Sequence, residues 1–375
     1  MPWKVETVMS QRKEFVTLAR MDEANMSEMC RRFGISRKTG HKWLRRYLEE
    51  GDGGLEDLSK RPRRSPNRTG EEMEQAVVDL RLEHPTKGSH VLARMLRSRG
   101  YAQVPSKSTI TSILRRRGLI EPRESAKSTP YKRFEHPHPN DLWQMDFKGP
   151  IPMTGGGRCH PLTLLDDHSR FSLGLRACPD EKGRTVQGHL ASIFRHYGMP
   201  HAMLMDNGPP WGADWHHPFT ALTVWMIELG IRVVHSRPRH PQTLGKLERF
   251  HRSLNIELLQ GNSYTHIAHC QSSFDRWRDF YNLERPHHSL KLDTPASRYS
   301  PSPRPFPETP PVAQYDDYDQ IRAVDTNGRI SFLGRSFYIT KALRGKRVAL
   351  RPASTDGAWS VFYFSQPITT IDFIQ

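Results

Sequence analysis

The chain has 375 residues, long enough for several domains, and a formal net charge of +16, of which +11 lies in residues 1–139. This basic front end predicts a polyanionic partner, most simply nucleic acid, although a protein that is basic only for solubility has the same composition. The four cysteines lack CxxC spacing, and there is neither a long apolar run nor an apolar leader, so we expect no zinc, no disulfides and no membrane span in a protein of the reducing cytoplasm.

Residues 1–50 predict a helix-turn-helix domain. A helix over 10–21 precedes a second helix capped by Ser27, a tight turn at Gly34 and a third helix capped by Ser36. The third helix is expected to pack inward through Trp43, Leu44, Tyr47 and Leu48. Its other face carries a basic set suited to phosphates and base edges in a major groove: Arg37, Lys38, His41, Lys42 and Arg45. The alternative is a solvated basic helix in a small bundle.

Residues 51–70 are rich in Gly, Pro and charge and predict a basic linker. Four of its cations either lie along a DNA groove or are simply solvated: Lys60, Arg61, Arg63 and Arg64. A second helix-turn-helix domain is expected over 71–120, with helices at 71–83, 89–99 and 106–117. Its last helix is capped by Ser106 or Ser108, and its exposed face carries Lys107, Thr111 and Arg115. Residues 121–139 predict another linker.

Residues 140–299 alternate between strand and helix patterns, which predicts an α/β domain. The expected strands are 142–148, 159–167, 170–178, 201–205 and 231–236. The expected helices are 183–198, 214–230, 243–260 and 264–282. Three hairpin-joined strands followed by this alternation are the order of a ribonuclease-H-like core, a fold that brings the ends of the first and fourth strands side by side.

The C-terminal part of the chain is expected to be separate from this core. Residues 300–315 are Pro-rich and predict an extended linker, and 316–375 hold several short β patterns that predict a small β-barrel. A set of cations in this tail either faces DNA or keeps the unit soluble: Lys341, Arg344, Lys346, Arg347 and Arg351. The whole chain is therefore expected to be a multidomain α+β protein.

Three separated acids fall on elements that can converge. Asp146 closes the first strand of the core, Asp206 follows the fourth, and Glu248 lies in the helix after the last. That helix has an apolar face, formed by Leu247, Phe250, Leu254 and Leu258, and Glu248 lies at its flank. Three carboxylates at one point are a way to hold two divalent metals for phosphoryl transfer. Singly, each acid has an ordinary structural explanation; as an ordered set they predict a metal site.

The motifs WQMDF, DDHSRF, DNGPPW, RPRHPQTLGKLERFH and FYNLERPHHSL…TPASRY resemble the integrase core of bacterial insertion-sequence transposases, the DDE group similar to retroviral integrases. The resemblance covers about 140–300 closely and extends to the helix-turn-helix front end. It implies a ribonuclease-H-like domain that binds two Mg²⁺ or Mn²⁺ ions, cuts at transposon ends and joins the freed 3′ ends to target DNA. By this match Asp146, Asp206 and Glu248 are the metal ligands and catalytic residues.

The resemblance also implies partners. The expected partner is double-stranded DNA, bound by a homo-oligomer because two ends must be held together, in the nucleoid of a bacterial cytoplasm. Gln242, Gly245 and Lys246 match the segment before the glutamate, and the expected DNA contacts in this region are Lys246, Arg249 and Arg252.

The sequence departs from the family's pattern in three ways. Forty-one residues separate Asp206 from Glu248, more than is commonest in the group, and Leu244 stands where relatives often have a polar residue. The front end lacks the His/Cys module of retroviral integrases, so we predict no zinc.

Other polar residues near these motifs have structural explanations. We expect Asp166 and Asp167 to form a cap with Ser169 and Arg170 rather than to help a metal. His240 and His251 are expected to meet phosphate or solvent. A last set is expected to pack or to contact a subunit or DNA: Tyr281, Asn282, Arg285, Pro286 and His287.

Two other functions remain open from the sequence. A DNA-binding regulator derived from a transposase would keep the helix-turn-helix units but not the reaction. A ribonuclease H would use the core but leave those units without a purpose.

Overall fold

A computed structural model describes residues 7–21, 24–58, 68–120, 135–212, 218–236, 245–355 and 357–373. The chain divides into two compact units, Met1–Arg68 and Thr69–Gln375. No helix in the described ranges is long and apolar enough to cross a bilayer.

The first unit contains α1 (Val8–Ala19), α2 (Met26–Arg32) and α3 (Arg37–Glu50), followed by a 3-10 turn, η1 (Gly51–Leu55). The helices pack around a small apolar core of Phe15, Val16, Cys30, Trp43 and Leu55. The Ser36 side chain accepts from the Thr39 amide and caps α3 as expected.

Three details of this unit differ from the prediction. The cap of α2 is Asn25, whose side chain accepts from the Ser27 and Glu28 amides, so Ser27 is not the cap. Leu48 is 65% exposed because it lies on the side of α3 away from the core. Residues 51–57, assigned to the linker, pack on the unit: Leu55 is fully buried, and Arg12 donates to its carbonyl oxygen.

The second unit begins with α4 (Glu71–Glu83), α5 (Ser89–Ser98) and α6 (Lys107–Arg116). Ser106 caps α6, as one of the two predicted alternatives had it, and Gly118 follows the helix with φ of +71°. The three helices surround their own apolar cluster, centred on Leu80, Leu92 and Ile110. Both expected helix-turn-helix units are therefore present as compact helical groups.

The core is built on a mixed six-stranded sheet. Its strands are β1 (Leu142–Phe147), β2 (Ile151–Pro152), β3 (Arg158–Asp166), β4 (Ser172–Cys178), β5 (Ala202–Met205) and β6 (Arg232–His235). Their order is β2-β3-β1-β5-β6, with β4 on β3. β1 is antiparallel to β3 and parallel to β5, and β5 is parallel to β6. The five expected strands are present, with the first beside the fourth as predicted, and β2 is a short strand that was not predicted.

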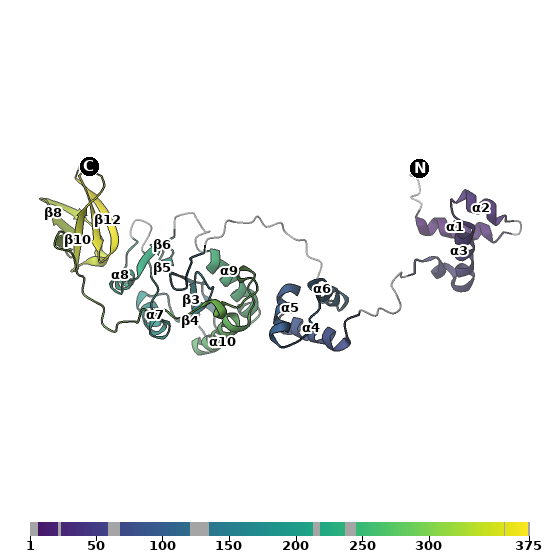
Figure 1. Cartoon of the computed structure of the whole chain (residues 1–375), viewed down its shortest axis with the longest axis horizontal. Coiled ribbons are helices and arrows are strands. Elements are labelled where there is room, and N and C mark those ends of the chain that lie inside the picture. Colours follow the sequence, from purple (N-terminus) through teal and green to yellow (C-terminus); the bar gives the residue numbers. More distant parts are fainter. Residues whose placement is uncertain are drawn as a thin grey trace. The chain divides into compact units, whose positions relative to one another are not determined.

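Helices cover both faces of the sheet (Figure 1). On one face, α7 (Gly183–Tyr197) and α8 (Ala221–Glu228) pack on residues such as Trp143, Met145 and Leu164. On the other, α9 (Gly245–Leu254) and α10 (Ile267–Asp279) pack on Leu165 and Leu175. Both helices were expected to run on as α-helix, but each ends in a π-helical turn, η3 (Asn255–Leu259) after α9 and η4 (Phe280–Glu284) after α10.

The chain after the core is anchored to it. Arg304 donates to the carbonyl oxygens of Leu229 and Gly230, and the Tyr299 ring stacks on Phe171.

The C-terminal strands are β7 (Gln320–Ala323), β8 (Arg329–Phe332), β9 (Arg335–Tyr338), β10 (Arg347–Pro352), β11 (Ala358–Tyr363) and β12 (Gln366–Asp372). They form a four-stranded sheet, β12-β11-β10-β7, and a hairpin, β8-β9 (Figure 1). Within the described residues neither sheet closes, so the expected barrel is present only as an all-β unit.

A glycine in α3 provides a test of the first unit's packing. A Cβ on Gly40 would lie 2.6 Å from Cys30 Sγ and 2.9 Å from Phe15 Cζ. We expect Gly40→Ala to lower the free energy of unfolding by about 1–3 kcal/mol, because overpacking outweighs the gain in helix propensity.

Gly188 in α7 is the matched control, since nothing lies within 4 Å of its added Cβ. Gly188→Ala is expected to leave stability unchanged or to raise it by up to about 1 kcal/mol. Calorimetry of the full chain, following the transition of each unit, measures both. A stabilised Gly40→Ala protein would show that Cys30 and Phe15 do not pack as tightly against Gly40 as these distances indicate.

Candidate active site at the ends of β1 and β5

The sheet brings Asp146 and Asp206 side by side. β1 and β5 are parallel and in register from Leu142 opposite Ala202 to Gln144 opposite Leu204. Continuing this register by two residues sets Asp146 at the end of β1 opposite Asp206, just past the end of β5. Both carboxylates therefore lie at the carboxyl edge of the parallel part of the sheet, where ligand sites of open α/β sheets are found.

Backbone contacts fix the orientation of both side chains. Asp146 Oδ1 accepts from the Phe147 amide at 2.8 Å, and Asp206 Oδ1 accepts from the Gly208 amide at 3.1 Å. On β6, the ring Nδ1 of His235 lies 2.7 Å from the Asp206 carbonyl oxygen. His235 of the neighbouring strand β6 thus holds the backbone in place where Asp206 follows β5.

Burial and mutual repulsion make these two acids reluctant to ionise. The pKa of Asp146 is raised to about 7, first by burial and then by the negative charge of Asp206, with Glu181 and Glu248 adding to it. The pKa of Asp206 is also raised, again mainly by burial. A divalent cation would relieve this repulsion, and carboxylate oxygens are the ligands that Mg²⁺ and Mn²⁺ prefer. The donor set therefore fits a hard cation.

Glu248 approaches the pair from α9. The helix buries Leu247, Phe250 and Leu254 and leaves Glu248 exposed at the flank of that face, as the sequence predicts. The negative charge of Glu248 also raises the pKa of Asp146, but less than the charge of Asp206 does. Across the described residues, no three Asp, Glu, His or Cys side chains are arranged to hold one ion. The structure thus sets Asp146 and Asp206 at neighbouring strand ends and places both Asp206 and Glu248 close enough to act electrostatically on Asp146.

Glu181 is an acid of this site that the sequence analysis missed. It lies between β4 and α7, it adds to the negative field at both Asp146 and Asp206, and its Oε1 is 2.8 Å from the His160 ring Nδ1. The signal available in the sequence was weak, since an acid just before a helix is usually only a favourable partner of the helix N-terminus.

The expected cap at the end of β3 is present in part: Asp166 and Ser169 form it, whereas the Arg170 side chain donates to Glu135 instead. Asp166 is fully buried, and its Oδ2 accepts from the amide and the hydroxyl of Ser169. Asp167 is fully buried as well: Oδ1 accepts from Gln144 Nε2 and from the ammonium of Lys246, and Oδ2 from the His136 amide. Asp166 is thus a structural residue, and Asp167 attaches the start of α9 to the sheet.

The sequence matches known families along most of its length. It matches the Integrase core domain over residues 136–241 and 229–295 and the IS481 family transposase C-terminal domain over 319–375. A Helix-turn-helix domain matches 11–63 and a Homeodomain-like domain 39–114. These matches support an insertion-sequence transposase with an integrase-like core.

Individual relatives are more distant. The chain is 27% identical over 158 residues to the Insertion element IS407 uncharacterized 31.7 kDa protein of Burkholderia multivorans, covering 42% of this chain and 54% of the relative. It is 31% identical over 160 residues to the Insertion element IS476 uncharacterized 39.2 kDa protein of Xanthomonas euvesicatoria, covering 42% and 44%. The chain spans about half the length of these relatives.

A solved structure similar to the chain is the simian T-cell lymphotropic virus intasome in complex with PP2A regulatory subunit B56 gamma. The similarity covers 79% of this chain and 99% of that chain, at 16% identity and a TM-score of 0.38.

Among the cations expected to contact DNA, those that the structure describes lie on the surface, with one exception. The exposed set is Arg37, Lys38, His41, Lys42, Arg45, Lys107, Arg115, Arg249 and Arg252. Lys246 is instead bonded to Asp167 and only 18% exposed. Lys60, Arg61, Arg63, Arg64, His240, Gln242 and Leu244 lie outside the described residues. In the C-terminal unit, Lys346 is paired with Glu228 and Arg351 with Asp319, which leaves Lys341, Arg344 and Arg347 as exposed candidates.

The raised pKa of Asp146 predicts a pH-dependent cost to folding. Between about pH 4 and 7 the unfolded chain loses the Asp146 proton while the folded chain retains it, so the free energy of unfolding falls as pH rises through this window. Asparagine carries no charge. We therefore expect Asp146→Asn, without metal at pH 8, to be more stable than wild type by about 2 kcal/mol as an order of magnitude, and equally stable near pH 4.

Thermal unfolding in EDTA and in Mn²⁺ measures this. Mn²⁺ should stabilise the wild type more than Asp146→Asn, and the exposed Asp317→Asn should behave as wild type in both buffers. A wild-type protein more stable than Asp146→Asn in EDTA at pH 8 would contradict the repulsion described here.

Proposed function

We propose that the chain is a DNA transposase that cuts DNA at the ends of its element and joins them to target DNA by metal-dependent phosphoryl transfer. The observation that carries the proposal is the position of Asp146 and Asp206 at neighbouring strand ends, with the charges of Asp206 and Glu248 both raising the pKa of Asp146. Two acids kept partly buried at such an edge cost stability unless a cation is held there.

The three acids have distinct parts in this proposal. Asp146 and Asp206, oriented by the Phe147 and Gly208 amides, hold the cations from the sheet side, and Glu248 completes the ligand set from α9. When bound, two divalent cations lower the pKa of the attacking water or 3′-hydroxyl and stabilise the leaving oxygen in an in-line displacement. No covalent protein intermediate is required, so the chain needs no nucleophilic side chain.

The rest of the chain delivers DNA to this edge. We propose helix-turn-helix domains at 1–50 and 71–120 for the element's ends, a core at 140–299 and an all-β domain at 316–375. The exposed face of α3 supplies contacts through Arg37, Lys38, His41, Lys42 and Arg45, and that of α6 through Lys107 and Arg115. Arg249 and Arg252 project from α9 beside Glu248 to hold phosphates near the reaction, and a multimer holds two ends at once.

A strand-transfer assay with labelled end DNA and Mg²⁺ or Mn²⁺ tests the proposal. Asp146→Asn, Asp206→Asn and Glu248→Gln are each expected to abolish cleavage and joining, by at least about 10³-fold, while binding of end DNA persists. Asp317→Asn, an exposed carboxylate outside the site, is the control and should retain activity.

Each rival function has its own outcome in the same assay. Binding of end DNA without nicking or joining by the wild type would favour the DNA-binding regulator. Degradation of an RNA–DNA hybrid with no action on end DNA would favour the ribonuclease H.

The α3 contacts predict a change in salt dependence. Arg37→Ala or Arg45→Ala should weaken binding of end DNA and reduce the slope of log K against log[salt] by about 0.9 each, because one phosphate contact is lost. Lys13, already paired with Asp52 at 2.6 Å, is the control, and Lys13→Ala should leave the slope unchanged. Slopes from binding titrations between about 50 and 200 mM salt decide the matter, and unchanged slopes in both arginine variants would remove α3 as the recognition helix.

A further inference from the structure

A short chain of hydrogen bonds connects α9 to the backbone of Asp146. The ring Nε2 of His251, on α9, lies 2.8 Å from Thr163 Oγ1, on β3. The same hydroxyl donates to the Asp146 carbonyl oxygen at 2.7 Å. Thr163 is also the residue directly opposite Asp146 in the antiparallel pairing of β1 and β3. The helix that carries one acid is thus joined, through one hydroxyl, to the peptide of another.

The direction of these bonds follows from their chemistry. A hydroxyl has one proton, and the carbonyl oxygen of Asp146 can only accept, so the Thr163 proton is used there. The Thr163 oxygen must then accept from His251, which fixes the proton of the neutral ring on Nε2. Burial supports a neutral ring, because it lowers the pKa of His251 to about 4.

These two hydrogen bonds restrain the turn of α9 that carries Glu248. Residues three apart on a helix lie on the same side, about one turn from each other, so Glu248 and His251 move together when α9 rotates. Thr163 is fully buried in a strand that is paired on both sides, so the fixed end of the tether is rigid. At the other end of the same turn, Lys246 is bonded to buried Asp167. Glu248 lies between two attachments to the sheet.

We propose that His251 and Thr163 are positioning residues, which set the rotation of α9 and hence the distance of Glu248 from Asp146, so that a divalent cation can be shared between them. The inference rests on the proposed function of the three acids. It adds that the Thr163 hydroxyl on β3 and the His251 ring on α9 determine how tightly the site holds metal, although neither group touches metal or DNA. Residues that hydrogen-bond to metal ligands, without touching the metal themselves, commonly contribute ten- to a hundredfold to metal affinity.

The test measures Mn²⁺ binding to the full chain by the loss of the free-Mn²⁺ EPR signal, in the absence of DNA. Thr163→Val and His251→Phe keep the shape of each side chain but remove the hydrogen bond, and each is expected to weaken Mn²⁺ binding about tenfold. Thr163→Ser and His251→Gln restore a hydroxyl and an N–H donor and should recover most of the affinity. His196→Phe, an exposed histidine on α7, should bind as wild type.

The double variant distinguishes positioning from general damage. Because both side chains act through one tether, Thr163→Val/His251→Phe should lose about as much affinity as the worse single variant, not the product of the two losses. Wild-type Mn²⁺ affinity in His251→Phe and Thr163→Val overturns the proposal, and so does an affinity loss that Thr163→Ser and His251→Gln fail to recover. A calorimetric melting temperature lowered without a change in Mn²⁺ affinity assigns the pair a structural role only.

Cleavage of end DNA separates this inference from the proposed function. If the wild type binds Mn²⁺ and the variants weaken it, but no protein cuts or joins DNA, the transposase proposal fails while the positioning holds. If the wild type cuts DNA and all variants need the same Mn²⁺ concentration for half-maximal cleavage, the transposase proposal stands and the positioning is wrong. A wild type that binds no Mn²⁺ overturns both.

Discussion

The repulsion between Asp146 and Asp206 is the constraint around which the core is arranged. Parallel strands in register end at one edge, so an acid at each end has to face the other. The surrounding structure does not relieve the repulsion: one amide donates to each carboxylate, while burial raises both pKa values. The apolar cluster beneath, with Met145 and Met205 fully buried, holds the two strands together against this cost. A cation at this edge would turn a destabilising pair into a stabilising one.

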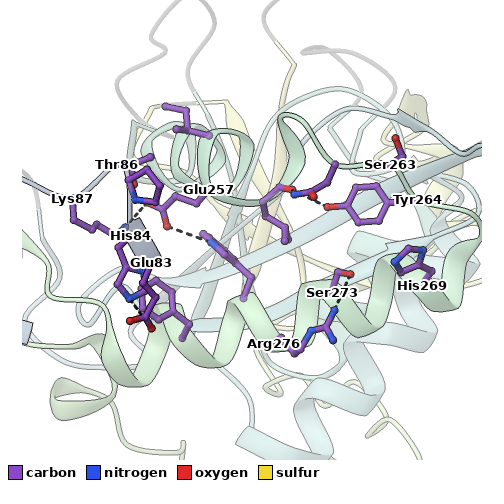
Figure 2. Close-up of a pocket in the computed structure, with 16 residues that line it drawn as sticks. Glu83, His84, Thr86, Lys87, Glu257, Ser263, Tyr264, His269, Ser273 and Arg276 are labelled. Carbon is purple, nitrogen blue, oxygen red and sulfur yellow. Dashed lines mark hydrogen bonds and ion pairs between the residues drawn. The ribbon is translucent and has the colours of Figure 1, made fainter. Parts of the chain in front are cut away.

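Helix α9 connects this edge with the second helix-turn-helix unit. Its continuation η3 carries Glu257, which accepts from Arg285 and, at 2.5 Å, from buried Lys87 in the segment between α4 and α5. Burial lowers the pKa of Lys87 to about 8, so removing the carboxylate would leave a poorly solvated cation behind. Lys87 and Glu257 line one part of a pocket of about 590 Å³. Figure 2 shows Glu83, His84 and Lys87 with Glu257 on one side of this pocket, and Ser263, Tyr264 and His269 on the other. The helix that carries Glu248 is therefore also the one that contacts the second helix-turn-helix unit.

Local patterns predicted most of the fold, and long-range contacts explain what they missed. Strand alternation and the caps Ser36 and Ser106 depend on a few neighbouring residues, so the elements and their order were predictable. The packing of residues 51–57 depends on Arg12, some forty residues away, and the π turns after α9 and α10 depend on what those helices meet. The neighbouring positions of Asp146 and Asp206 were predictable because the order of elements sets β1 beside β5, and the charge of Glu248 acts on Asp146 from α9. Glu181 was not, because only the closed fold brings its charge near them.

Lys246 has a buried partner that its place in the sequence does not indicate. Two residues before Glu248 in a basic segment, it was expected to contact DNA, yet its ammonium is bonded to the side chain and the carbonyl oxygen of Asp167. Asp167 is fully buried, so its charge requires a cation, and a phosphate that recruited Lys246 would leave this carboxylate with two neutral donors, Gln144 and the His136 amide. Burial also lowers the pKa of Lys246. Arg249 and Arg252, which are exposed on the same helix, can meet DNA without that loss. The electrostatics of α9 thus separate its cations into one that attaches the helix and two that remain exposed.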